Sequence, residues 1–125
     1  MSTITTSDEH VNLCVVVGKV SADPILRTLP SGSEVLTIDV LSTIDDEKIS
    51  VPVEVFEPDT LARRMETGDT VVAVGSVKRW FFRSGGATAS RVRLQAKSLR
   101  NANDRSITDA AYELMHRAFS MQLVD

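Results

Sequence analysis

The stretches TVVAVGSVKRWFFR (residues 70–83) and ASRVRLQAKSL (residues 89–99) flank the short segment SGGAT (residues 84–88). Both flanking stretches contain apolar or aromatic residues in alternation with polar ones, which is typical of β-strands. The adjacent glycines between them favour a tight turn, because glycine adopts backbone angles that other residues avoid. The pattern therefore predicts a long β-hairpin with a flexible glycine tip.

Three further strands are predicted before this hairpin. Residues 11–20 are nearly all apolar, as expected of a strand buried on both faces, and Gly18 within them indicates a bulge or a bend. Residues 35–41 and residues 49–56 alternate in polarity, and the acidic segment 45–47 between them is predicted to be a hairpin connection.

Two helices are predicted as well. A short helix is expected to begin at Pro58 and to end near Gly68, which suits a C-terminal cap. A second helix is expected from Ile107 to Met121, with Ser106 and Asp109 as its N-terminal capping pair. Three strands, a short helix and two strands match a mostly β fold, the five-stranded and partly open OB-fold barrel, here with an additional C-terminal helix.

The expected domain organisation is a flexible tail over residues 1–10, an OB-fold domain over residues 11–100 and a helical extension over residues 101–125. The 125 residues suit one domain. Net charge is −3, but residues 1–70 have a balance of −8, whereas residues 71–100 contain seven Lys or Arg and no acid. A phosphate backbone responds to such a local cluster more than to the total charge. The hairpin region is thus the predicted nucleic-acid contact.

At this point the chain resembles the bacterial single-stranded-DNA-binding proteins over about residues 11–100. The matching positions, in chain order, are Val11-Asn12, the run Cys14 to Val20, Asp23-Pro24, Arg27, the run Val53 to Phe56, Gly68-Asp69 and Gly75. The resemblance implies an OB-fold, commonly a homotetramer, that coats single strands in replication, repair and recombination. It also implies stacking roles for Phe56 and Phe82 and a basic role for Arg27.

The chain departs from the family pattern in three ways. Ser50 stands where the family often has tryptophan, and Pro52 and Glu54 replace apolar or basic neighbours. The connection at residues 45–47 is short and acidic, where relatives often have a longer loop that grips DNA. Residues 120–125 lack the linker and acidic tip that many members use to recruit partners. We therefore expect a specialised paralogue with lower affinity and a different partner network.

The candidate site follows from strand alternation. Lys78, Trp80 and Phe82 are expected on one face of the hairpin and Arg79, Phe81 and Arg83 on the other, and Arg91 and Arg93 share a face with Lys97 on the second strand. Bases can stack on exposed rings while cations neutralise phosphates. The predicted nucleic-acid-binding residues are Arg27, Phe56, Lys78, Arg79, Trp80, Phe82, Arg83, Arg91, Arg93 and Lys97. Taken alone, an aromatic residue in a β-strand is more often part of a core than of a binding site. Surface arginines can also serve only to keep the edge of a sheet soluble.

Other chemistry is not indicated by the sequence. His10 and His116 have no second ligand at metal spacing, and Cys14 lies in an apolar strand, so neither a metal site nor a nucleophile is predicted. No phosphate loop or nucleophile elbow occurs, and we expect a binding protein without a cofactor rather than an enzyme. Without a signal-like N-terminus or a 20-residue apolar run, the expected location is the cytoplasm, at the nucleoid, away from membranes.

In the leading hypothesis, a binder of single-stranded DNA, the protein is expected to be a homo-oligomer, either a tetramer or a dimer. Two alternatives remain open. The first alternative is an OB-fold module that assembles with other proteins, favoured by the acidic residues Asp45, Glu47 and Glu54 and by the extra helix. The second is an RNA-binding OB domain, because stacking and phosphate contacts serve RNA and DNA alike.

Overall fold

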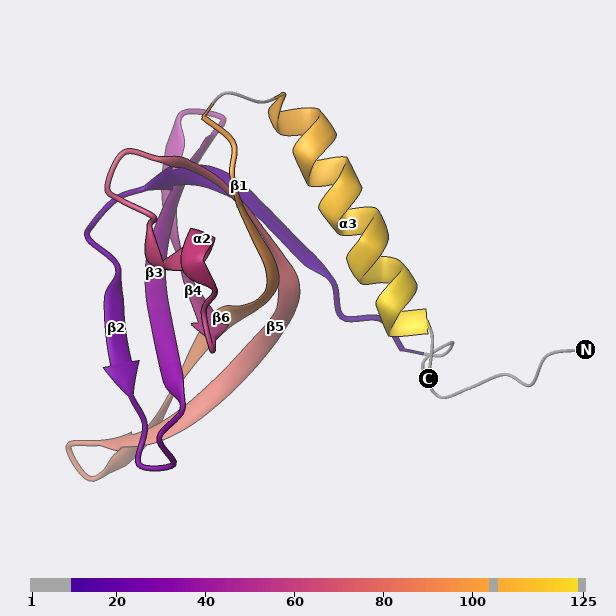
Figure 1. Ribbon diagram of the computed structural model, residues 1–125. Helices are drawn as coiled ribbons and strands as arrows, with labels where there is room; N and C mark the ends of the chain where they lie inside the picture. Colours follow the sequence, from indigo (N-terminus) through magenta and orange to yellow (C-terminus); the bar gives the residue numbers. More distant parts are fainter. Residues whose placement is uncertain (1–9, 104–105, 124–125) are drawn as a thin grey trace, which may run out of the picture.

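The computed structural model describes residues 10–103 and 106–123, and the fold is mostly β. The predicted tail therefore lies outside the described residues except for His10. The elements in chain order are β1 (Cys14–Val20), β2 (Ile25–Thr28), β3 (Glu34–Ile44), β4 (Glu47–Phe56), α2 (Thr60–Arg63), β5 (Thr70–Ser84), β6 (Ala87–Asn101) and α3 (Ile107–Leu123). Figure 1 shows the strands wrapped around one another with α3 lying against one side.

The six strands form one sheet in the order β1-β5-β6-β4-β3-β2, and an additional pairing between β1 and β3 closes it into a ring. All neighbours are antiparallel except β4 and β6, which run parallel at Val53–Leu94 and Glu54–Gln95. The helix α2 lies between β4 and β5 in the chain. Consequently, residues of β4 and β6 that are 41 positions apart in sequence lie side by side.

Strands β3 to β6 are longer than the sequence predicts and their turns are tighter, whereas β1 begins at Cys14 and is shorter than the predicted strand 11–20. Asp45 and Asp46 both have positive φ and join β3 to β4 as a two-residue turn, which confirms the acidic hairpin connection. The predicted five-residue tip at 84–88 is wrong: only Gly85 and Gly86, both with positive φ, separate Ser84 from Ala87. Strand β2 was not predicted. It is a short, exposed edge strand that pairs only with β3.

The first helix is much shorter than expected. Asp59 accepts a hydrogen bond from the Ala62 amide and caps α2, which ends at Arg63 with Arg64 as its C-cap. Residues 66–69 instead form a turn in which the Glu66 amide donates to the Asp69 carboxylate (2.9 Å). The helix predicted to reach Gly68 is therefore wrong in its length, because local side-chain acceptors satisfy the backbone in a turn.

Two glycines stand where strands approach closely. A Cβ on Gly18 would lie 2.3 Å from the Leu41 carbonyl oxygen of β3, at the point where β1 closes the ring. Pairing of β1 with β5 continues without a shift through Gly18. Of the two features predicted at Gly18, the bulge is therefore wrong, and the bend stays a prediction. The bulge occurs instead between Val74 and Gly75, where Lys97 of β6 is the extra residue.

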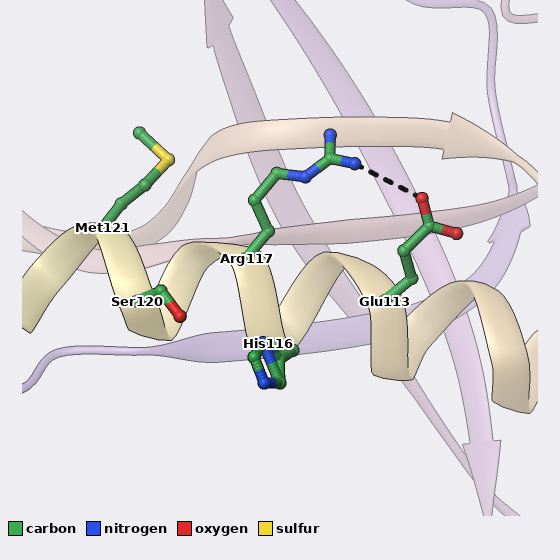
Figure 2. Close-up of a pocket in the computed structure, with 5 residues that line it drawn as sticks. All are labelled: Glu113, His116, Arg117, Ser120 and Met121. Atoms are coloured by element: carbon green, nitrogen blue, oxygen red, sulfur yellow. Dashed lines mark hydrogen bonds and ion pairs between the residues drawn. The ribbon is translucent and has the colours of Figure 1, made fainter.

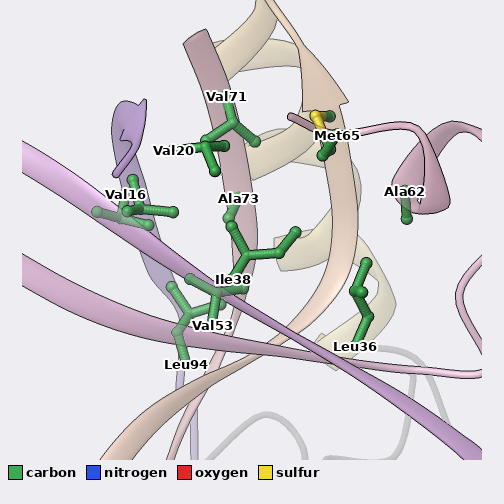
Figure 3. Close-up of a cluster of buried hydrophobic side chains, with 11 residues drawn as sticks. Val16, Val20, Leu36, Ile38, Val53, Ala62, Met65, Val71, Ala73 and Leu94 are labelled. Carbon is green, nitrogen blue, oxygen red and sulfur yellow. The ribbon is translucent and has the colours of Figure 1, made fainter. Parts of the chain in front are cut away.

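Buried apolar side chains form two cores, one on each side of β1 and β5. The first fills the ring, and Figure 3 shows Val16, Ile38 and Leu94 converging within it from different strands. The second lies outside the ring, where Leu114 and its helical neighbours cover Val72 and Val74. Strand β1 has Val16 buried in the first core and the half-buried Val15 and Val17 packed against the second, so apolar side chains pack on both of its faces, as predicted.

The α3 helix begins as predicted, since the Asp109 amide donates to the Ser106 hydroxyl (3.3 Å). None of the helices within residues 10–103 and 106–123 is long and apolar enough to span a bilayer.

Candidate nucleic-acid interface

The β5–β6 hairpin extends beyond the closed part of the ring, at the lower left of Figure 1. Strand β1 pairs with β5 only as far as Gly75, and β4 pairs with β6 only at Leu94 and Gln95. Between the Val77–Leu94 pair and the turn, β5 and β6 therefore pair only with each other. Asn12 closes the end of this junction, since its side-chain amide exchanges two 2.9 Å hydrogen bonds with the backbone of Val77.

One face of this hairpin carries aromatic and basic side chains together. In the register, Lys78 lies opposite Arg93, and Trp80 lies opposite Arg91. The rings of Trp80 and Phe82 are 6.0 Å apart. The guanidinium carbon of Arg93 lies 3.7 Å from the centre of the Trp80 ring, and that of Arg91 lies 5.2 Å from the centre of Phe82. Such contacts are attractive because the face of an aromatic ring is electron-rich.

The Trp80 side of the hairpin borders a groove of about 370 Å³, here called the indole groove. Its lining residues come from the β2–β3 region, β4 and the hairpin, and they are Arg27, Leu29, Val35, Glu54, Phe56, Lys78, Arg79, Trp80, Arg93 and Gln95. Trp80 remains 45% exposed and Phe56 44% exposed. Two large rings and four cations, from segments far apart in the sequence, thus line one open space.

Glu54 compensates part of this positive charge. Its carboxylate oxygen Oε2 accepts a hydrogen bond from Arg93 and lies 3.5 Å from Arg27 Nη2. The Arg93 and Glu54 side chains are only 13% and 14% exposed, whereas Arg27 is 45% exposed. Arg93 is therefore held between a carboxylate and the indole, while Arg27 has access to solvent.

The opposite face of the hairpin is different. Phe81 is 62% exposed there, beside exposed Val77 and Val92. Arg79 donates to the Ser90 hydroxyl (3.5 Å), and Arg83 donates to the Gly86 carbonyl (3.3 Å). These two predicted site residues alternate away from Trp80 and Phe82, although Arg79 also contributes to the wall of the indole groove.

Lys97 also lies apart from the indole groove. It lines a second groove of about 310 Å³ together with Arg100 and Arg117, and Phe56 borders both grooves. The bulge at Lys97 breaks the alternation that placed it with Arg91 and Arg93 in the sequence analysis. Of the ten predicted residues, the structure brings together Arg27, Phe56, Lys78, Trp80, Phe82, Arg91 and Arg93 around the Trp80 side of the hairpin.

Neither Glu54 nor Gln95 was predicted as a binding residue, although strand alternation places Gln95 on the same face as Arg91 and Arg93. Both residues project from strands whose parallel pairing places them next to each other in the indole groove. The sequence drew attention to Glu54 as a departure from the family pattern and as one of the acidic residues that favour a protein-interaction module. Its position in an alternating strand indicates an outward side chain, but no sequence signal indicates its arginine partners.

Other surfaces of the described residues offer fewer groups that could bind a ligand or take part in a reaction. Figure 2 shows a shallow hollow along α3, where Arg117 and Glu113 form an ion pair of 3.4 Å. Burial raises the pKa of the Cys14 thiol, which disfavours the thiolate. Within the part of the chain that the structure describes, no three His, Cys, Asp or Glu side chains are grouped as metal ligands.

No protein-family model matches the chain, and no curated protein matches its sequence. The chemistry of the indole groove is therefore the basis for a functional assignment.

Proposed function

We propose that this chain is an OB-fold protein, related to the bacterial single-stranded-DNA-binding proteins, that binds single-stranded DNA without sequence preference. Support for the fold comes from five strands that close a ring, a helix between β4 and β5 in the chain, and parallel pairing of β4 with β6. In this proposal the protein is a homo-oligomer that acts in replication, repair or recombination.

The observation that carries the proposal is the exposed Trp80 ring beside cations in an open groove. A base that stacks on this ring gains about 1–3 kcal/mol, whatever its identity, because every base has a flat aromatic face. Lys78 and Arg27 lie in the same groove and can neutralise the phosphates of the stacked nucleotides. Stacking together with charge neutralisation suits a single strand, since the bases of a duplex are already stacked on one another.

The decisive experiment is a titration with oligothymidine at low salt, followed by the fluorescence of Trp80. Because Trp80 is the only tryptophan, the signal reports this groove alone. We expect quenching and an affinity that falls steeply with added salt. Duplex DNA of the same length serves as a control and should bind more weakly. Unchanged fluorescence without any mobility shift would remove the proposal.

An RNA ligand is tested in the same titration with oligouridine. Equal affinity for oligouridine and oligothymidine would indicate a general single-strand binder, and a clear preference for oligouridine would favour the RNA-binding alternative.

The protein-interaction module is favoured by a separate observation, the exposed apolar residues Val77, Phe81 and Val92 on the opposite face of the hairpin. Pull-down after nuclease treatment separates the two functions. Partners that persist support the module, and partners that disappear support nucleic-acid binding.

A further inference from the structure

We propose that the Glu54 carboxylate occupies the position of a DNA phosphate in the unliganded protein. When DNA binds, Arg27 leaves Glu54 and pairs with a phosphate of the DNA instead. This inference rests on the proposed function. Glu54 would then set the affinity of the site and its response to salt.

The geometry separates the two arginines that share this carboxylate. Arg93 is nearly buried, with its guanidinium group against the Trp80 ring on one side and Glu54 on another. Arg27 is at the open side of the groove, 3.5 Å from the same carboxylate oxygen and largely exposed. Both ion pairs share the nearly buried Glu54, but only Arg27 can be hydrated when it leaves, and Glu54 then keeps Arg93 as a partner. Removing the nearly buried Arg93 would instead strand a charge away from water, which is expensive. Arg27 is therefore the arginine that can leave.

A carboxylate and a phosphate oxygen offer an arginine similar hydrogen-bond acceptors. When Arg27 moves to a phosphate, the DNA releases a counterion, but Glu54 loses one of its two cations. The local gain in charge neutralisation is therefore partly cancelled. Without the carboxylate, the same contact would release a counterion with no such offset.

The test is the Glu54→Gln variant, which keeps the shape of the side chain and an acceptor for Arg93. We expect oligothymidine to bind about 3- to 10-fold more tightly, and the slope of log affinity against log salt to steepen by about 0.7 for each arginine freed. Glu66→Gln is the matched control, since it changes net charge equally at an exposed position that lines neither groove. It should leave both quantities nearly unchanged.

A second measurement uses the groove cations, and its first comparison needs no Glu54 variant. Lys78 lines the same groove, and no ion pair joins it to another of the described residues. We expect Lys78→Gln to weaken binding more than Arg27→Gln does, because part of the Arg27 charge is spent on Glu54. In the Glu54→Gln background, the loss caused by Arg27→Gln should grow.

The outcomes are distinguishable. If the unchanged protein binds and Glu54→Gln is folded but binds no more tightly with the same salt slope, the exchange is wrong while the proposed function stands. Arg27→Gln costing at least as much as Lys78→Gln in the otherwise unchanged chain would also overturn it. If neither the unchanged protein nor Glu54→Gln binds oligothymidine, the proposed function fails, and the exchange fails with it.

Discussion

Trp80 combines two properties that a stacking residue requires. It is held in place by Arg93 at 3.7 Å, and it is 45% exposed to solvent. We predict that Trp80→Ala weakens oligothymidine binding by about 1–3 kcal/mol, the usual contribution of one stacked base. The melting temperature should change little, because substitutions of exposed side chains seldom alter stability strongly. Fluorescence anisotropy of a labelled oligonucleotide measures the affinity, since the intrinsic tryptophan signal is lost in this variant.

Phe81→Ala is the matched control for that prediction. Phe81 is the next residue in the strand and is more exposed than Trp80, but it lies on the opposite face of the hairpin. It should leave the affinity within about two-fold, well below the loss expected of a stacking ring. An equal loss in both variants would mean that the hairpin as a whole, rather than one of its faces, contacts DNA.

At the residue scale, the sequence predicted which hairpin side chains share a face with Trp80. Strand alternation sufficed for Lys78, Phe82, Arg91 and Arg93, because antiparallel partners in register project to the same side. It failed for Lys97, where a bulge inserts one residue. It also could not predict the pairing of Arg93 with Glu54, since that contact depends on the parallel pairing of β4 with β6, two strands that are far apart in the chain.

At the scale of elements, the turn after α2 is tied to the end of β6 through Asp69. Its carboxylate accepts from the Glu66 amide (2.9 Å) and from the Asn103 side-chain amide (3.0 Å), and Asn103 in turn accepts from the Thr70 amide (2.6 Å). The hydrogen bond from the Glu66 backbone, and to a smaller extent that from the Asn103 side chain, lowers the pKa of Asp69. These hydrogen bonds join the turn at residues 66–69 to the start of β5 and to the segment that follows β6.

We predict that Asp69→Ala lowers the free energy of unfolding by about 1 kcal/mol at neutral pH, the usual net worth of such hydrogen bonds. Because the folded pKa lies below the unfolded value of about 3.9, the contribution of the charge is complete above that pH and is lost as pH falls through the folded pKa. Urea unfolding at a series of pH values should therefore show the difference between the two proteins shrinking below about pH 4. A difference that grows on acidification would contradict this assignment.

The sequence predicted the existence and order of the strands and of both helices apart from β2, and it failed mainly at their ends. Residues 58–68 have helical spacing of Leu61 and Met65, yet Asp59 and Asp69 satisfy the local backbone amides and leave a four-residue helix. Strand β2 contains exposed Ile25 and Leu26 with no buried face. Because both faces of β2 are exposed, its residues do not alternate between apolar and polar, and the sequence contains no pattern that predicts this strand.

At the scale of the whole molecule, the two cores share β5. Val71 and Ala73 of this strand face the interior of the ring, whereas Val72 and Val74 face α3. Detaching α3 would expose the second pair to water on a strand that the first pair holds in the ring. The ring and α3 are therefore expected to unfold together, in one cooperative transition.

Leu114→Ala tests this coupling, because Leu114 is 1% exposed at the centre of the α3 core. We predict a loss of about 2–5 kcal/mol in the free energy of unfolding, as for other buried leucines. Circular dichroism follows helix and sheet together, while Trp80 fluorescence follows the hairpin, and both midpoints should move by the same amount. Tyr112→Ala, an exposed position on the same helix, should change stability by no more than about 0.5 kcal/mol. If the dichroism transition came first and the Trp80 transition stayed in place, α3 would be an independent layer, and the Val72 and Val74 face of β5 would have to be stable in water without it.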